Sequence, residues 1–77
     1  MTEAAAQLPL AVRLREARRE AGLTNLALAQ KLGVTERTIA GWQGVKSAPR
    51  SRPSYERLVE LARILDKPVS YFIEEVA

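Results

Sequence analysis

Residues 24–44 read TNLALAQKLGVTERTIAGWQG, and this stretch decides the fold of the chain. It contains two short segments with apolar residues at helical spacing, each preceded by an apolar residue and a threonine. The hydroxyls of Thr24 and Thr35 can accept hydrogen bonds from the backbone N–H groups that the first turn of a helix leaves unpaired. Gly33, between the segments, suits the left-handed backbone that ends a helix. The pattern predicts a helix, a tight turn and a second helix.

Side chains around these helix starts support the prediction. Leu23 can pack on Leu28, and Val34 on Ile39, which is the spacing of a hydrophobic staple. Trp42 lies three residues after Ile39, and this spacing favours burial in the core over stacking on a base. The second helix of the pair is therefore expected to run from residue 35 to about residue 43.

The flanking sequence predicts three further helices that hold this pair. Apolar residues recur at helical spacing from about Pro9 until Gly22 ends the segment. Ser54 can cap a fourth helix, which Pro68 stops, and a short fifth helix covers roughly residues 69–75. We expect an all-α protein, a compact five-helix bundle whose helices 2 and 3 form a helix-turn-helix. The apolar residues expected inside the flanking helices are Leu10, Leu14, Ala17, Ala21, Leu58, Leu61, Ala62, Leu65, Val69, Phe72, Ile73 and Val76.

Composition limits the chemistry of the chain. Its 77 residues include no cysteine and no histidine, so thiolate ligands, the commonest metal ligand and the commonest general base are all missing. We therefore expect no enzyme, no metal site, no cofactor and no small-molecule ligand. No apolar run approaches the roughly 20 residues that span a bilayer, and we expect a cytoplasmic protein. The length suits a single domain at residues 8–77, with residues 1–7 expected to be disordered.

Positive charge is concentrated in the middle of the chain. The formal net charge is +3, but residues 23–55 contain five basic residues and one acid, Glu36. Three of the five lie in GVKSAPRSRP, residues 44–53, which is expected to be a loop. This loop is either a flexible solvated connector or a basic segment that lies along a phosphate backbone, and a charge distribution of this kind suits a polyanion. The five basic residues are Lys31, Arg37, Lys46, Arg50 and Arg52.

Residues 25–44 resemble the twenty-residue helix-turn-helix of the phage-repressor and Cro-like DNA-binding family. Ala29 stands at the fifth position and Gly33 at the ninth, and apolar residues fill the remaining core positions, Leu28, Leu32, Val34, Ile39 and Trp42. The likeness extends to LREARREAGLT before the motif and to YERLVELARIL and PVSYFI after it. The resemblance implies a bacterial or phage-encoded, lambda repressor-like domain that inserts its third helix into the major groove of double-stranded DNA.

The same resemblance implies two sets of DNA-contacting residues. Arg37 can donate two hydrogen bonds to a guanine, and Glu36 can accept one from a cytosine amino group. The alternative for this pair is that the two charges balance each other in solvent. The positions implied to read bases are Thr35, Glu36, Arg37, Ala40 and Gly41. Those implied to bind phosphates are Asn25, Lys46, Ser47, Arg50 and Arg52.

Three features depart from the family pattern. Gly41 stands where many relatives have a long polar side chain, so one base-reading position carries no side chain. Gln43 stands where relatives often have a glutamate that pairs with an arginine at the position of Arg18, and a glutamine allows at most a hydrogen bond there. The loop before Ser54 is also several residues longer than the common form.

A sequence-specific transcription regulator that acts as a homodimer on two half-sites is the function we expect. One module of this size reads only a few base pairs, so useful affinity requires a second copy about one helical turn away. The implied dimer interface is Pro68, Val69, Tyr71 and Phe72, and the alternative for Phe72 is that it lies entirely in the core. With no second domain, the chain would fit a small phage repressor, a Cro-like protein or a restriction controller. The alternative function is a protein-interaction module, either an antitoxin or an adaptor, in which DNA binding is secondary.

Overall fold

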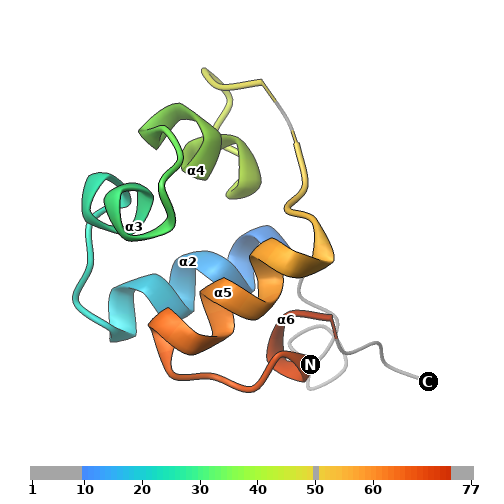
Figure 1. Ribbon diagram of the computed structural model, residues 1–77. Helices are drawn as coiled ribbons and strands as arrows, with labels where there is room; N and C mark the ends of the chain where they lie inside the picture. The colour runs from blue at the N-terminus through green and yellow to red at the C-terminus, as the bar shows by residue number, and fades with distance from the viewer. Residues whose placement is uncertain (1–9, 50, 74–77) are drawn as a thin grey trace, which may run out of the picture.

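The computed structural model describes residues 10–49 and 51–73, and within these ranges the chain forms five helices and no strand. Figure 1 shows α3 and α4 together at one end of the molecule and α6 at the other, with α2 and α5 running between them. The expected all-α fold with a helix-turn-helix is confirmed. Residues 1–7, expected to be disordered, and Arg50 lie outside the described residues. The helices are α2 (Leu10–Glu20), α3 (Asn25–Leu32), α4 (Glu36–Trp42), α5 (Tyr55–Leu65) and α6 (Ser70–Ile73).

Hydroxyl caps begin the three central helices at the positions that the sequence predicts. The Thr24 hydroxyl accepts a hydrogen bond from the backbone N–H of Ala27 at 3.0 Å. The Thr35 hydroxyl accepts from the N–H of Thr38 at 3.1 Å. Ser54 begins α5 in the same way and accepts from the N–H of Arg57 at 3.2 Å. Each cap satisfies an N–H group for which the helix itself has no acceptor.

Residues in the left-handed conformation end α3 and α5. Gly33 has φ +75°, and its N–H and that of Val34 both donate to the carbonyl of Ala29, at 2.8 and 3.0 Å. In α5 the left-handed residue is Asp66, at φ +59°, so this helix stops before Pro68 reaches it. Aspartate is one of the few residues other than glycine that adopt this conformation readily.

The core lies between all five helices. Leu14, Leu28, Ile39 and Leu61 are fully buried, and Trp42 is 6% exposed, as its spacing from Ile39 predicts. The small Ala29 of α3 is also buried, and α3 packs on α4. The remaining buried apolar residues are Ala17, Leu32, Leu58, Ala62, Leu65 and Phe72. Burying these side chains is the dominant favourable contribution to the stability of a domain of this size.

Two residues expected in the core are exposed instead. Ala21 lies in the turn after α2, beyond the last helical residue, so helical spacing no longer directs it inward. Ile73, at the end of α6, is 45% exposed because the neighbouring Phe72 fills the core from that helix. Val76 lies outside the described residues.

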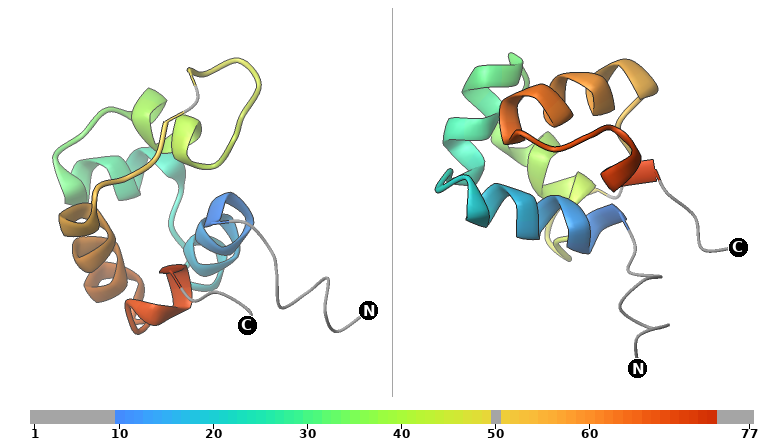
Figure 2. Two further views of the ribbon diagram at one scale, coloured as in Figure 1. Left: turned by 90° about the vertical axis from the view of Figure 1, so that its right-hand side faces the viewer. Right: turned by 90° about the horizontal axis from the view of Figure 1, so that it is seen from below.

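Arginine side chains connect helices that are distant in the sequence. Arg13 in α2 donates to the carbonyl of Tyr71 at 2.7 Å, which holds α6 against α2. The view from below in Figure 2 shows α6 beside the start of α2. Arg57 in α5 donates to the carbonyl of Leu32 at 3.1 Å and so caps the end of α3. None of the helices in residues 10–49 and 51–73 is long and apolar enough to cross a membrane.

Candidate nucleic-acid interface

The first turn of α4 carries the exposed polar side chains that the resemblance assigns to base reading. Thr35, Glu36 and Arg37 are exposed, and Ala40 is half-buried. Glu36 and Arg37 form no ion pair with each other, because the ion pairs between described residues are Arg57–Glu60 and Lys67–Glu20. Both long side chains are therefore available to a ligand.

Thr35 is less free than its exposure suggests. Its hydroxyl accepts from the N–H of Thr38 and lies 2.9 Å from the hydroxyl of the same residue. This pair of threonines fixes the entry to α4. Among the predicted base-reading residues, Glu36 and Arg37 are thus the long side chains that no described residue holds.

Gly41 is not on the exposed surface, and the sequence-based placement of this residue needs correction. It is buried beneath the loop that follows α4. A Cβ atom at this position would overlap the carbonyl oxygen of Pro49 and would lie 3.2 Å from the hydroxyl of Ser51. Helical spacing puts Gly41 on the same side as Arg37, but the returning chain covers it.

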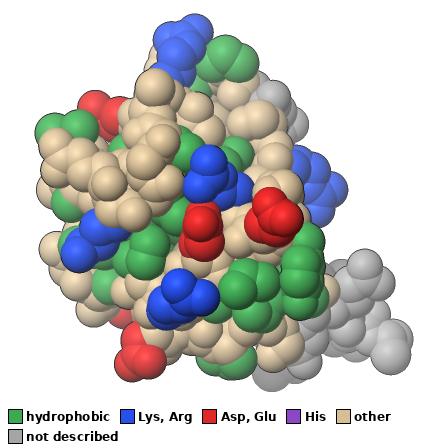
Figure 3. All heavy atoms as spheres, in the orientation of Figure 1, with side chains coloured by type: hydrophobic (Ala, Val, Ile, Leu, Met, Phe, Trp, Pro, Cys, Tyr) green, Lys and Arg blue, Asp and Glu red, His purple; other side chains and the backbone are tan. Residues whose placement is uncertain are grey.

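The basic loop between α4 and α5 is folded back on the end of α4. The N–H of Val45 donates to the carbonyl of Ala40 at 3.1 Å, and that of Ala48 to the carbonyl of Val45 at 3.1 Å. Lys46, Ser47 and Arg52 are exposed along this loop, and Arg50 lies outside the described residues. In Figure 3 a basic side chain stands at the top of the molecule, over this loop.

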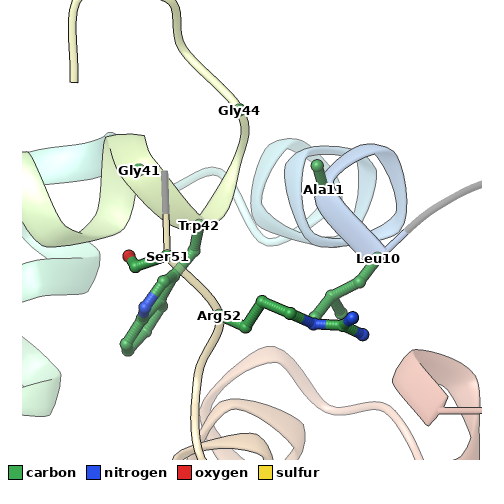
Figure 4. A pocket seen from close by; sticks show the side chains of 7 residues that line it. All are labelled: Leu10, Ala11, Gly41, Trp42, Gly44, Ser51 and Arg52. Carbon is green, nitrogen blue, oxygen red and sulfur yellow. The ribbon is translucent and has the colours of Figure 1, made fainter. Parts of the chain in front are cut away.

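A cavity of about 490 Å³ lies between the loop, the end of α4 and the start of α2. Figure 4 shows Ser51 beside Gly41 and Trp42, and the side chain of Arg52 directed toward Leu10. The cavity is open to solvent, and the loop forms one of its walls. Arg52 thus lies between α2 and α4, and the loop that carries it packs against the domain.

Asn25, a predicted phosphate-binding residue, belongs to a hydrogen-bond network that also includes Arg18 and Gln43. The side-chain oxygen of Asn25 accepts from Nε2 of Gln43 at 2.7 Å. Nε of Arg18 donates to Oε1 of Gln43 at 3.4 Å. A glutamine in place of the family's glutamate allows this hydrogen bond, which is present but long. Arg18 also donates to the carbonyl of Leu23 at 2.7 Å. Sequence reasoning identified Gln43 as unusual but missed its contact with Asn25, for which the sequence offers no signal.

Arg18 carries its charge in a partly buried and electropositive place. Burial lowers the pKa of the Arg18 guanidinium from its ordinary value, and the nearby charges of Arg19 and Arg15 lower it further. A guanidinium stays protonated near neutral pH despite such a shift. Because Gln43 is neutral, it accepts a hydrogen bond from Arg18 without compensating its charge.

The residues implied to form a dimer interface are divided between core and surface. Phe72 is 4% exposed and belongs to the core, which corrects its assignment to an interface. Pro68 is exposed, and Val69 and Tyr71 are half-buried. The ring of Tyr71 meets that of Phe72 edge-on and has the ammonium of Lys67 at 4.9 Å from its centroid.

Within the described residues, no three acidic side chains gather as a metal site would require.

Together, the fold and this surface define a helix-turn-helix DNA-binding module. Residues 14–42, from within α2 to the last residue of α4, match a family model described as helix-turn-helix. This segment is a helix-turn-helix of the Cro/C1 type, which is lambda repressor-like, and that family is one of DNA-binding regulatory domains that are not typically enzymatic. No curated protein matches the chain. The likeness of α5 and α6 to the same family stays a prediction.

Proposed function

We propose that the protein is a sequence-specific regulator of transcription that binds double-stranded DNA as a homodimer, with α4 in the major groove. The exposed first turn of α4 is the observation that carries this proposal. Glu36 and Arg37 project there from a helix whose other side is fixed in the core by Ile39 and Trp42. A rigid support of this kind holds hydrogen-bonding groups in the register that base recognition requires.

Base recognition on this proposal rests on two side chains of opposite chemistry. Arg37 donates to O6 and N7 of a guanine, and Glu36 accepts from N4 of a cytosine. Thr35 and Ala40 contribute a hydroxyl and a methyl group at the edges of this surface. A bidentate arginine contact contributes about 1–3 kcal/mol of discrimination against the wrong base.

Phosphate contacts come from both sides of α4. Asn25 lies at the first residue of α3, and Lys46, Ser47 and Arg52 lie on the loop that folds back after α4. Arg50, which belongs to the same loop sequence, is proposed for the same role. Contacts of this type fix the position of the protein on the duplex and supply affinity without reading sequence.

Homodimer formation on two half-sites is the finer part of the proposal. Its proposed surface is the exposed and half-buried part of the segment around α6, namely Pro68, Val69 and Tyr71, with Phe72 supporting it from the core. A two-fold dimer doubles the number of bases read and requires half-sites about 10–10.5 base pairs apart. The proposed role is that of a repressor, and the family resemblance motivates that choice.

Selection of binding sites from random duplexes tests whether the protein reads sequence and whether it binds as a two-fold dimer. The expected result is a two-fold symmetric motif, and Arg37→Ala should relax one base pair in each half-site. A motif with one half-site would contradict the dimer. Recovery of no motif, with binding that declines steeply in salt for every duplex, would leave a non-specific binder.

A further inference from the structure

Gln43 is the one buried polar side chain in the described part of the chain, with 8% of its surface exposed. It follows the last residue of α4 and reaches both other helices of the DNA-binding module. Its Oε1 accepts from Nε of Arg18 in α2 at 3.4 Å, and its Nε2 donates to Oδ1 of Asn25 in α3 at 2.7 Å. The same Nε2 lies 3.4 Å from the carbonyl of Ile39.

The chemistry of Arg18 determines the orientation of both amides in this network. A guanidinium has donors and no acceptor, so the side chain of Gln43 must turn its oxygen toward Arg18. Its NH₂ group then faces Asn25, and Asn25 must turn its own oxygen toward Gln43. The NH₂ group of Asn25 is thereby left on the side of the amide away from Gln43. Asn25 is half-buried, so part of this side chain is accessible.

We propose that Gln43 is a positioning residue for DNA binding. Because its oxygen faces the donors of Arg18, its NH₂ group faces the oxygen of Asn25, and Asn25 therefore presents its own NH₂ group to a phosphate oxygen. The inference rests on the proposed DNA contact of Asn25. An amide NH₂ donates a hydrogen bond to an anionic oxygen, whereas the amide oxygen in its place would repel that anion. The orientation of one buried glutamine thus decides whether Asn25 attracts or repels the DNA backbone.

Glutamate in place of Gln43 would reverse the orientation of Asn25. A carboxylate has only acceptors, so it would pair with Arg18 and turn its second oxygen toward Asn25. Asn25 would then rotate its amide to donate inward and would present its oxygen to the DNA. The same change adds an ion pair inside the domain, so Gln43→Glu should preserve or raise thermal stability while it lowers DNA affinity. If Gln43 had a purely structural role, Gln43→Glu would not lower DNA affinity while thermal stability is preserved or raised.

The test measures thermal unfolding and DNA affinity of Gln43→Glu, Asn25→Ala and the double variant on one duplex that carries the selected motif. Loss of a hydrogen bond to a charged group corresponds to about a tenfold or greater loss of affinity, which we expect for Gln43→Glu and for Asn25→Ala. In the Asn25→Ala background, Gln43→Glu should cost at most about twofold, because the group that it reorients is gone. The residual factor measures the general repulsion between the added charge and DNA.

Equal losses from Gln43→Glu in both backgrounds would overturn the proposal, since charge repulsion alone would then explain them. Unchanged affinity of Asn25→Ala would overturn it as well. If Arg37→Ala still relaxed the motif in that case, the proposed function would stand without this inference. If Gln43→Glu does not fold, Gln43→Ala provides the same comparison without an added charge. Gln43→Ala alone should lower DNA affinity relative to the wild type, whereas adding it to Asn25→Ala should leave the affinity of Asn25→Ala unchanged. Equal losses of affinity in the two cases would again refute the inference.

Discussion

Replacing Gly41 by alanine should destabilise the protein, although the same change inside a helix ordinarily stabilises it. Alanine is about 0.8–1.0 kcal/mol more favourable than glycine in a helix interior. Here the added Cβ would overlap the carbonyl oxygen of Pro49, which is a backbone atom and cannot rotate away as a side chain does. Forcing extra volume into a packed place costs about 1–3 kcal/mol. The difference is a net loss of about 0–2 kcal/mol.

The same substitution should weaken DNA binding through the loop. Displacement of Pro49 and Ser51 would also shift Arg52, which follows Ser51, and Lys46, which lies earlier in the same loop. Both side chains are proposed to bind phosphates, so their displacement should reduce affinity for operator and random DNA alike. For each phosphate that the protein no longer neutralises, the slope of log affinity against log salt becomes shallower by about 0.9.

Urea unfolding and DNA titrations over a salt series measure the two effects. The matched control is Ala40→Gly, which costs about 1 kcal/mol of helix propensity at the neighbouring position and adds no atom near the loop. The control should lose stability and keep the salt slope of the wild type, whereas Gly41→Ala should reduce that slope. The packing argument is refuted if Gly41→Ala is about 1 kcal/mol more stable than the wild type and binds DNA with an unchanged slope.

Three further substitutions test the site and the core. Arg37→Ala should cost about 1–3 kcal/mol on the selected motif and little on random DNA, as measured by parallel titrations, and equal losses on both would show that α4 does not read bases there. Lys46→Ala should weaken all duplexes alike and lower the salt slope by about one unit, so an effect confined to the motif would contradict a phosphate contact. Leu28→Ala removes a fully buried side chain and should lower the free energy of unfolding by about 2–5 kcal/mol in urea titrations, and a loss below about 1 kcal/mol would contradict its central place in the core.

Local signals in the sequence determined the helices and their beginnings. Thr24, Thr35 and Ser54 each cap the helix that they were predicted to begin, because a cap needs only its own hydroxyl and an N–H group three residues later. Gly33 ends α3 for a similar reason, since its left-handed backbone depends on the absence of its own side chain. The buried faces of α3 and α4 also followed from spacing, as Leu28 and Ile39 show.

Only the tertiary structure decided which predicted DNA-contacting positions are accessible and how they are oriented. Spacing along α4 places Gly41 beside Arg37, but burial of Gly41 depends on Pro49 and Ser51, which lie against the helix. The orientation of Asn25 depends on Gln43 and Arg18, and these three residues come from three different parts of the fold. Helical periodicity describes one element at a time, whereas both of these results arise from contacts between elements. The sequence by itself therefore determined the helix-turn-helix, and the packing of the loop and of α2 around it decided the surface that this module offers to DNA.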